Sequence, residues 1–305
     1  MIIDVHTHIF EEKMWAKKFL DELRAIKKKT LTPEGYERYT IGAKTEALIK
    51  DMDSAGIDVS VCLPIDFAFM CQQEPEISIR KANEYVAEAQ QKYPDRIVGF
   101  CGVDPMRADA IDILEWGVKE LGLRGVKIFP GIFYPNEERV APFMQKIEEL
   151  NVPVLFHQGA DPLPYVLKYG DPRYIDDLLL KYPRFRVIAA HLARGYGDLL
   201  FEMAAQRPGR LWMDVSTCQY EFHYSKWHLL MRLRLLMDRL PNAVLLGTDW
   251  PFIKNPPLPS HKDWLDFLRN MELPKSFLDM GMKQFTKEEK EKLLGENAKS
   301  LLNLK

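Results

Sequence analysis

The sequence is poor in cysteine and has no long apolar run. Four of its 305 residues are cysteine, and none of them form a CxxC pair. Isolated thiols within apolar segments behave as small hydrophobic side chains, which disfavours a disulfide framework or a cysteine metal site. A membrane-spanning helix needs about 20 apolar residues, and no apolar run approaches that length. The first residues lack the pattern of a signal peptide. We therefore expect a reduced, cytoplasmic protein that does not bind membranes.

Strongly basic segments are missing as well. The formal net charge is -2, and acidic and basic residues are mixed along the chain. The densest basic run, Lys27 to Lys29, is short and is interpreted as the solvated end of a helix. Because no basic stripe with interleaved aromatic residues occurs, nucleic acid is not an expected partner. A small-molecule substrate remains, and a homodimer is expected only by analogy.

Short apolar runs rich in Val, Ile and Phe recur along the chain and predict buried strands. They are continuous rather than alternating, which is typical of parallel strands covered on both faces. Segments with apolar residues at three- and four-residue spacing separate them and predict helices. The predicted strands are 2–8, 59–64, 97–103, 125–129, 152–157, 186–191, 211–215 and 243–247. The predicted helices are 43–54, 76–93, 108–121, 137–150, 172–181, 197–206 and 225–240.

Eight strands that alternate with helices predict an α/β protein with a (β/α)₈ TIM barrel, in one domain that spans 1–305. An open doubly wound sheet is the alternative. A Rossmann dinucleotide site is disfavoured because no GxGxxG follows the first strand. Long loops are expected after strand one (10–41) and strand eight (252–275), at the end of a barrel where active sites lie. Both loops are candidate lids or substrate walls.

Two histidines end the first predicted strand. His6 and His8 are two residues apart, and because side chains alternate along a strand, both rings point to the same side. Two imidazoles placed in this way can bind one metal ion. An HxH pair alone is equally compatible with a structural role. Its interpretation depends on what stands at the other strand ends.

Further residues of the ligand type stand where other apolar strands stop. His157 ends the fifth strand, His191 the sixth and Asp249 the eighth. A barrel brings such positions together around one mouth, so the pattern favours a metal site over separate structural histidines. The remaining histidines, His223, His228 and His261, lie in predicted loops or helices and are expected at the surface. Only His223, which follows strand seven, is kept as a candidate for substrate contact.

These residues lie in motifs that resemble the amidohydrolase superfamily. The resemblance is to the amidohydrolase-related branch, which includes 2-amino-3-carboxymuconate semialdehyde decarboxylase and related aromatic-acid decarboxylases and lactonases. The motifs run in order from one end of the chain to the other. They are IIDVHTHIF, GVKIFP, VPVLFHQGA, DPRYIDDLLLKYPRFRVIAAHLARG, LWMDVS, VLLGTDWPF and GENAKSLLNL. The resemblance is specific for the superfamily and the branch and not for the substrate.

The resemblance implies roles for the strand-end residues. His6, His8, His157 and Asp249 would bind one divalent metal ion, zinc being the ion expected in this branch. His191 would act as the acid/base residue, and Asp249 would help to handle the proton of metal-bound water. Such a site polarises a carbonyl group and activates water, and a neutral histidine can move the proton near neutral pH.

A second ion and the substrate contacts are less constrained by the sequence. Lys127 stands where binuclear relatives carry a carboxylated lysine, so it or His191 could hold a second ion; one ion is our expectation. Arg194, in HLARG, could bind a substrate carboxylate or form a surface ion pair. This motif departs from the HxGG-like pattern of the branch. Trp250 and other aromatic residues near the mouth could line the pocket.

Three functions remain open at this point. The first is a metal-dependent hydrolase of a small carboxylated ester, lactone or amide, with His191 as the acid/base residue, and it is the one favoured here. The alternative is a metal-dependent decarboxylase of a small aromatic or unsaturated acid, since the family contains both activities and a fold does not set function. A catalytically silent scaffold is disfavoured by the intact ligand set.

Overall fold

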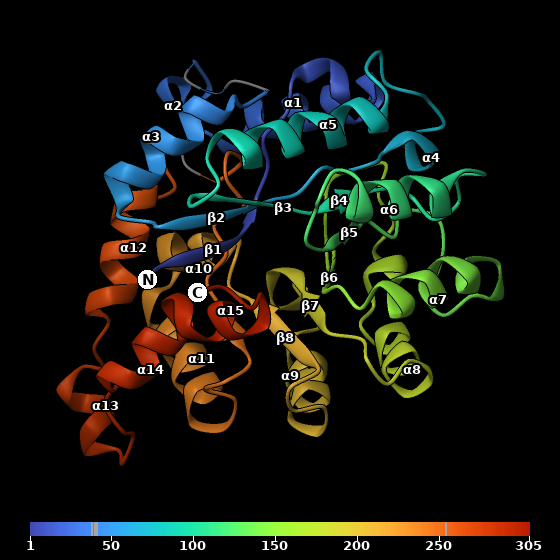
Figure 1. Ribbon diagram of the computed structural model, residues 1–305. Helices are drawn as coiled ribbons and strands as arrows, with labels where there is room; N and C mark the ends of the chain where they lie inside the picture. The colour runs from blue at the N-terminus through green and yellow to red at the C-terminus, as the bar shows by residue number, and fades with distance from the viewer. Residues whose placement is uncertain (38, 40–41, 254) are drawn as a thin grey trace.

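The computed structural model describes residues 1–37, 39, 42–253 and 255–305, and its strands follow the predicted apolar runs (Figure 1). All predicted strands are present, although each is shorter than its apolar run. β3 and β4 form one predicted strand that is interrupted only at Phe100. The strands are β1 (Ile3–Thr7), β2 (Val59–Cys62), β3 (Ile97–Gly99), β4 (Cys101–Gly102), β5 (Val126–Ile128), β6 (Val154–Phe156), β7 (Val187–Ala189), β8 (Leu211–Asp214) and β9 (Val244–Leu245).

Parallel pairing runs around the whole set of strands. Neighbours are hydrogen-bonded in the orders β1-β2-β3 and β4-β5-β6-β7-β8-β9, and every pair is parallel. Where the segment around β9 meets β1, the Val5 amide donates to the Leu246 carbonyl (2.9 Å) and the Asp249 amide to the His6 carbonyl (2.8 Å). Because the last strand returns to the first, the fold is the predicted closed (β/α)₈ barrel and not an open sheet.

The helices on the outside of the barrel follow the predicted segments closely. They are α3 (Thr45–Ala55), α5 (Ile79–Lys92), α6 (Ala110–Lys119), α7 (Ala141–Leu150), α8 (Arg173–Lys181), α9 (Gly197–Gln206) and α11 (Lys226–Arg239). Each presents an apolar stripe to the strands. Short helices lie in the connections: α4 (Ala68–Cys71), α10 (Gln219–Tyr224) and α13 (Lys275–Asp279). In the described part of the chain, no helix is long and apolar enough to span a membrane.

The two segments predicted as long loops carry helices. The segment after β1 contains α1 (Lys17–Thr30) and α2 (Pro33–Glu37), and the segment after β9 contains α12 (His261–Asn270). Residues 38, 40, 41 and 254 of these segments lie outside the described residues. The side chains of Phe19, Leu20, Leu23 and Lys27 on α1 are buried, so this helix packs onto the barrel as a wall.

Apolar side chains fill the inside of the barrel. One buried cluster joins residues of strands that lie on different sides of the barrel, and such residues can meet only within it. Its members include Ile3, Val61, Phe100, Leu155, Ile188 and Leu245. Ala298, Leu301 and Leu302 from the end of the chain belong to the same cluster. The barrel is therefore a packed core, which leaves its carboxyl end for a site.

The chain end closes the amino end of the barrel. α14 (Lys287–Glu291), a π-helical turn (Lys292–Glu296) and α15 (Asn297–Leu301) run below the strands, and the two termini lie near each other (Figure 1). The guanidinium groups of Arg124 and Arg186 donate to the carbonyls of Leu302 (2.8 Å) and Leu301 (3.2 Å). These arginines satisfy carbonyls that the end of α15 leaves unpaired.

Candidate active site

The two histidines of β1 point into one cluster at the carboxyl end of the barrel. The register of β1 against β2 shifts between Asp4 and Thr7, and both His6 and His8 line the same cavity. Their ring centroids are 5.1 Å apart. Asp4 instead accepts a hydrogen bond from the Thr248 hydroxyl (2.5 Å) and has a structural role.

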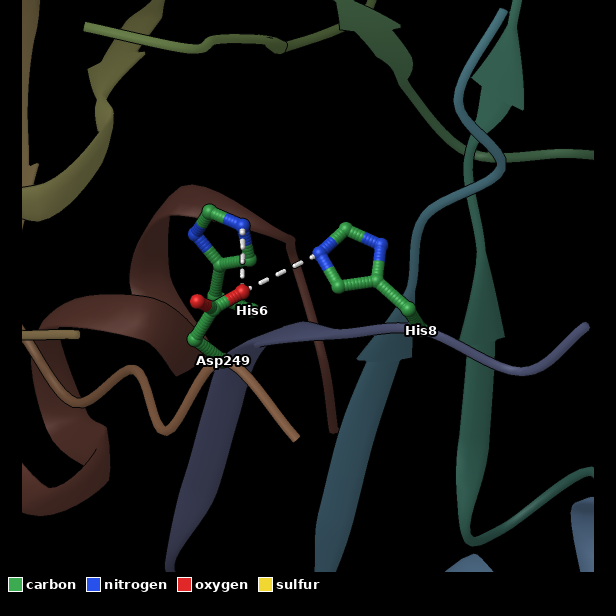
Figure 2. Close-up of side chains that lie close together, drawn as sticks. All are labelled: His6, His8 and Asp249. Atoms are coloured by element: carbon green, nitrogen blue, oxygen red, sulfur yellow. Dashed lines mark ion pairs between the residues drawn. The ribbon is translucent and has the colours of Figure 1, made fainter. Parts of the chain in front are cut away.

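Asp249 lies between the two rings (Figure 2). Its Oδ1 is 3.3 Å from His8 Nε2 and 3.7 Å from His6 Nε2. One donor atom from each of the three residues lies within 4.8 Å of the others, a spacing that suits a shared metal ion. Burial raises the pKa of Asp249, but the hydrogen bond with His8 and the electrostatic influence of the His6 and His191 rings outweigh burial and bring it to about 2. The carboxylate is therefore ionised at neutral pH.

Hydrogen bonds on the far side of each ring turn the inner nitrogens toward the cluster. His6 Nδ1 is 2.9 Å from Asp214 Oδ2, and His8 Nδ1 is 2.7 Å from the Leu63 carbonyl oxygen. Since these oxygens only accept, both Nδ1 atoms carry a proton, so Nε2 is the nitrogen of each ring that would face a cation. Burial, with the nearby charge of Lys127, holds the pKa of His6 well below its usual range. The donor set of this cluster thus fits a divalent metal ion.

The Asp214 carboxylate joins the candidate ligands to the candidate acid/base residue. While Oδ2 accepts from His6, Oδ1 accepts from the amides of His191 (3.1 Å) and Ser216 (3.0 Å) and from the Ser216 hydroxyl. That hydroxyl in turn lies 2.7 Å from His191 Nδ1. Asp214 is fully buried, so this network fixes two rings from one point.

His191 lies in a strained turn directly after β7. His191, Leu192 and Ala193 have φ values of 61, 49 and 45°, which place three successive residues in the left-handed region. Asp249 has a φ of 56°. Such conformations cost free energy in residues other than glycine and are concentrated at functional sites. Burial also lowers the pKa of His191, so its ring is neutral at neutral pH.

His157 lines the same cavity but stands apart from the tight group of His6, His8 and Asp249. Its ring stacks on Phe129, with the centroids 4.3 Å apart, and lies 5.0 Å from the ring of His191. His157 Nε2 is buried and has no hydrogen-bond partner among the described residues. A buried nitrogen without a partner is costly unless a ligand satisfies it, which is a second indication that a cation belongs here.

Two residues near His157 complete the polar floor of the cavity. Asp161 Oδ2 is 3.6 Å from His157 Nε2, and burial together with the charge of Asp249 raises the pKa of Asp161 to about 8. Lys127 is buried on β5, and its Nζ is 3.4 Å from His6 Nε2. Burial lowers the pKa of Lys127 to about 8. A second group suited to a metal, His6 with His191 and Asp214, lies beside the first.

The cavity above this cluster measures about 300 Å³. Its apolar part comes largely from aromatic and aliphatic side chains of α1, of the segment just before α1, and of the loops after β2, β5 and β9: Trp15, Phe19, Leu23, Ile26, Ile65, Phe67, Phe129, Phe252 and Ile253. Phe252 stacks on Trp15 with the ring centroids 5.3 Å apart. The cavity is therefore small, flat-walled and polar on one side, which suits a small aromatic ligand with charged substituents.

The interpretation of Lys27 as part of a solvated helix end is wrong. Only 4% of Lys27 is exposed, whereas Lys28 and Lys29 are exposed as expected. Lys27 Nζ donates to the Phe252 carbonyl (2.8 Å) and lines the cavity. Lys27 follows Leu20 and Leu23 on the buried stripe of α1, so its position on the helix places its amine in the pocket.

The candidate substrate residues divide into one that reaches the cavity and two that do not. Arg194 lines the cavity, and its guanidinium carbon lies 5.2 Å from the centre of the Tyr220 ring. His223 is exposed on α10 and lines a separate surface hollow. Trp250 is buried outside the cavity, where its Nε1 donates to Asp51 (2.8 Å).

The two other histidines differ from each other. His228 is exposed on α11 and forms an ion pair with Glu221, as expected for a surface residue. His261, however, is buried at the start of α12, so its expected place at the surface is wrong. Neither residue lines the cavity.

Comparison with known proteins identifies the family to which this arrangement belongs. A sequence model of the amidohydrolase family matches residues 3–304. The chain belongs to this family. The family assignment agrees with the resemblance that the strand-end motifs indicate, and it makes the protein an enzyme of the amidohydrolase superfamily.

Several proteins that are named as decarboxylases are similar to this chain. Gamma-resorcylate decarboxylase from Polaromonas sp. is 25% identical over 254 residues, which cover 67% of this chain and 76% of the relative. 2-Amino-3-carboxymuconate-6-semialdehyde decarboxylase from Dictyostelium discoideum is 24% identical over 298 residues, 84% of this chain and 76% of the relative. Among solved structures, a 5-carboxyvanillate decarboxylase from Novosphingobium aromaticivorans, complexed with manganese and 4-hydroxy-3-methoxy-5-nitrobenzoic acid, has a TM-score of 0.67 at 16% identity. It covers 100% of this chain and 96% of that one, and it shows a shared fold.

Proposed function

We propose that this amidohydrolase is a metal-dependent decarboxylase of a small aromatic or unsaturated carboxylic acid. The observation that carries the proposal is an aromatic-walled cavity of about 300 Å³ set directly on a cluster of His6, His8 and Asp249. Both curated relatives are named as decarboxylases, which supports decarboxylation in place of the hydrolysis that the sequence alone favoured.

His6, His8, His157 and Asp249 are the residues that would hold one divalent ion. The three histidines are buried, and Asp249 is ionised at neutral pH, so the set combines imidazole nitrogens with one carboxylate. When bound, the ion supplies electrostatic stabilisation of negative charge on the substrate's carboxylate and on a neighbouring oxygen.

His191 is the proposed acid/base residue. Ser216 donates its hydroxyl proton to Asp214, so its oxygen accepts from His191 Nδ1, and the lone pair remains on His191 Nε2. This nitrogen can accept the proton of a substrate hydroxyl group and return it to the carbon that loses carbon dioxide. The electron pair of the broken carbon–carbon bond stays on that carbon and takes up the proton.

Two features of the cavity orient the acid. The rings of Trp15, Phe67 and Phe252 exclude water and offer flat surfaces to an aromatic ring. Arg194 lines the cavity and forms no ion pair with an acidic residue in the described part of the chain, so it is available to bind a carboxylate.

A reaction screen in oxygen-18 water tests the proposal. The protein is loaded with Zn²⁺ or Mn²⁺ and offered hydroxybenzoates and lactones, and carbon dioxide and the product masses are measured. We expect carbon dioxide release without solvent oxygen in the product, abolished in His191→Ala and in metal-depleted protein. Incorporation of solvent oxygen without release of carbon dioxide would establish hydrolysis instead. Turnover that persists after rigorous removal of metal would sink both chemistries.

A further inference from the structure

Lys27 is a buried cation without a carboxylate partner. Its Nζ donates to the Phe252 carbonyl oxygen (2.8 Å), and the centre of the Tyr39 ring is 5.7 Å away. No acidic side chain of the described residues forms an ion pair with this amine, which retains donor capacity beyond its one hydrogen bond. Lysine is almost never this deeply buried unless something pairs with its charge.

The charge of the amine survives at neutral pH. Burial lowers the pKa of Lys27 to about 8, and the charges of Asp249 and Asp161 oppose that fall. A protonated amine therefore faces the cavity at pH 7. A single carbonyl oxygen offsets only part of the cost of burying a charge, so an arriving anion would satisfy the remaining donors.

The cavity as a whole carries more positive than negative side chains. Lys27, Lys127 and Arg194 line it, against two acidic residues, Asp161 and Asp249. A divalent ion would add further positive charge. A substrate with one carboxylate, which is lost in the reaction, would leave this surplus largely uncompensated, whereas a substrate with two acidic groups matches it better.

We propose that Lys27 binds a second carboxylate of the substrate, one that is retained in the product, so that the enzyme acts on a small aromatic dicarboxylic acid. This inference rests on the proposed decarboxylation and specifies its substrate class. Lys27 stands on the apolar wall to which α1 contributes, while the His6 and Asp249 cluster forms the polar side of the same cavity. One acidic group thus has a place at the cluster and the other at Lys27.

Arg194 is less suited to select for the second carboxylate. Arg194 is exposed, and solvent screens much of its charge, whereas Lys27 is nearly excluded from water. A charge-assisted bond in a desolvated place gives the stronger discrimination between a ligand that has the group and one that lacks it. Lys27 is thus the specificity-determining residue of the pair.

Binding of ligands that are not turned over tests the proposal by titration calorimetry. The Zn²⁺-loaded protein is titrated with benzoate and with each of the three benzenedicarboxylates. The best dicarboxylate should bind on the order of tenfold or more tighter than benzoate. In Lys27→Met, which keeps the apolar stem, that preference should vanish while benzoate binding changes less than about twofold. Lys28→Met, the exposed neighbour on α1, is the matched control and should behave as wild type.

A second test of the proposal needs only the wild-type protein. The amide of the best dicarboxylate, with one carboxylate replaced by a neutral carbamoyl group of similar shape, should bind no better than benzoate. Equal binding of the diacid and its amide, or an unchanged preference in a folded Lys27→Met, would overturn the proposal. Because these ligands need not react, this outcome is independent of whether carbon dioxide is released from any acid, which tests the proposed function itself.

Discussion

The two ends of the barrel use charged side chains in opposite ways. At the amino end, arginines that precede strands donate to backbone carbonyls: Arg96 to Asp58, Arg124 to Leu302, Arg186 to Leu301 and Arg210 to Tyr182. At the carboxyl end, Lys27, Lys127 and Arg194 face a cavity, and no acidic residue of the described chain forms an ion pair with any of them. The arginines at the amino end therefore stabilise the fold, whereas the basic side chains at the carboxyl end are available to bind a ligand.

The backbone shows the same contrast. Left-handed φ values occur at the strand ends around the cavity, at His191, Thr217 and Asp249 (61, 69 and 56°). Toward the amino end they fall on Asn151 and Asn303 (52 and 50°), a residue type that adopts this conformation more readily. At the amino end, the carbonyls of α15 are held by hydrogen bonds. Strain and unpaired charge thus lie at the end where chemistry is proposed, and satisfied backbone groups lie at the other. Substitutions at the two ends should therefore separate activity from stability.

The largest effect is expected at Asp249. Asp249→Asn removes the ionised carboxylate that lies between His6 and His8, so we expect kcat/KM to fall by at least about a thousandfold. The far-ultraviolet circular dichroism spectrum should stay that of the wild type. Asp112→Asn on the exposed face of α6 is the control. Retention of more than about a tenth of the activity would contradict a ligand role for Asp249.

The next largest effect is expected at Asp214, which acts through the rings that it holds. Asp214→Asn lacks the second acceptor oxygen, so either His6 or the His191–Ser216 pair loses its partner. Metal affinity, measured by competition with a chelator, should fall by about 10- to 100-fold. Wild-type affinity in a folded variant would show that the network does not orient the ligands.

Matched arginine substitutions compare the two ends directly. Arg186→Met removes donors to the carbonyls of Leu301 and Asn151, and it should lower the free energy of unfolding in urea by about 1–3 kcal/mol with unchanged kcat/KM. Arg194→Met should raise KM by about tenfold and leave the unfolding free energy within about 0.5 kcal/mol. If both variants changed stability and neither changed KM, the functional contrast between the two ends would fail.

The smallest effect concerns a buried acid beyond β4. Burial, followed by the charge of Asp66, raises the pKa of Asp104 from 3.8 to about 7. A raised carboxyl pKa in the folded state favours the neutral form, so its contribution is complete below about pH 4 and is lost as pH rises through 7. Asp104→Asn should therefore gain stability relative to wild type between pH 4 and pH 8. Each unit of pKa shift corresponds to about 1.4 kcal/mol, and we expect a gain of at least that size. Parallel pH profiles of melting temperature for the two proteins would refute this.

The barrel could be predicted because its signals are local and repeated. Predicted helices end at pairs such as Tyr93-Pro94 and Tyr182-Pro183, and one predicted helix lies between each two successive apolar runs. The helices inside 10–41 and 252–275 were missed, because charged and aromatic residues there obscure the period. The closure of the amino end by α15 depends on contacts between residues that are far apart in sequence, such as Arg124 and Leu302.

The candidate site was predicted where it depends on strand ends. His6, His8 and Asp249 meet because parallel strands finish at the same end of a barrel. Ser216 and Asp161 were missed, since their importance comes from one hydrogen bond to His191 and one close approach to His157. Asp161 follows His157 by four residues in one loop, a spacing that gives no sign of which way a side chain turns.

The candidate metal ligands and much of the pocket wall come from different parts of the chain. The candidate ligands stand on strand ends that the whole barrel fixes, whereas Trp15, Phe19, Leu23, Ile26 and Lys27 of the pocket wall belong to one continuous insert after β1. Exchange of that single segment would replace much of the surface that recognises the substrate and would leave the reacting groups in place. Relatives that catalyse the same reaction could therefore differ in substrate through changes in this one segment. The same change could be engineered by grafting the segment from one relative onto another.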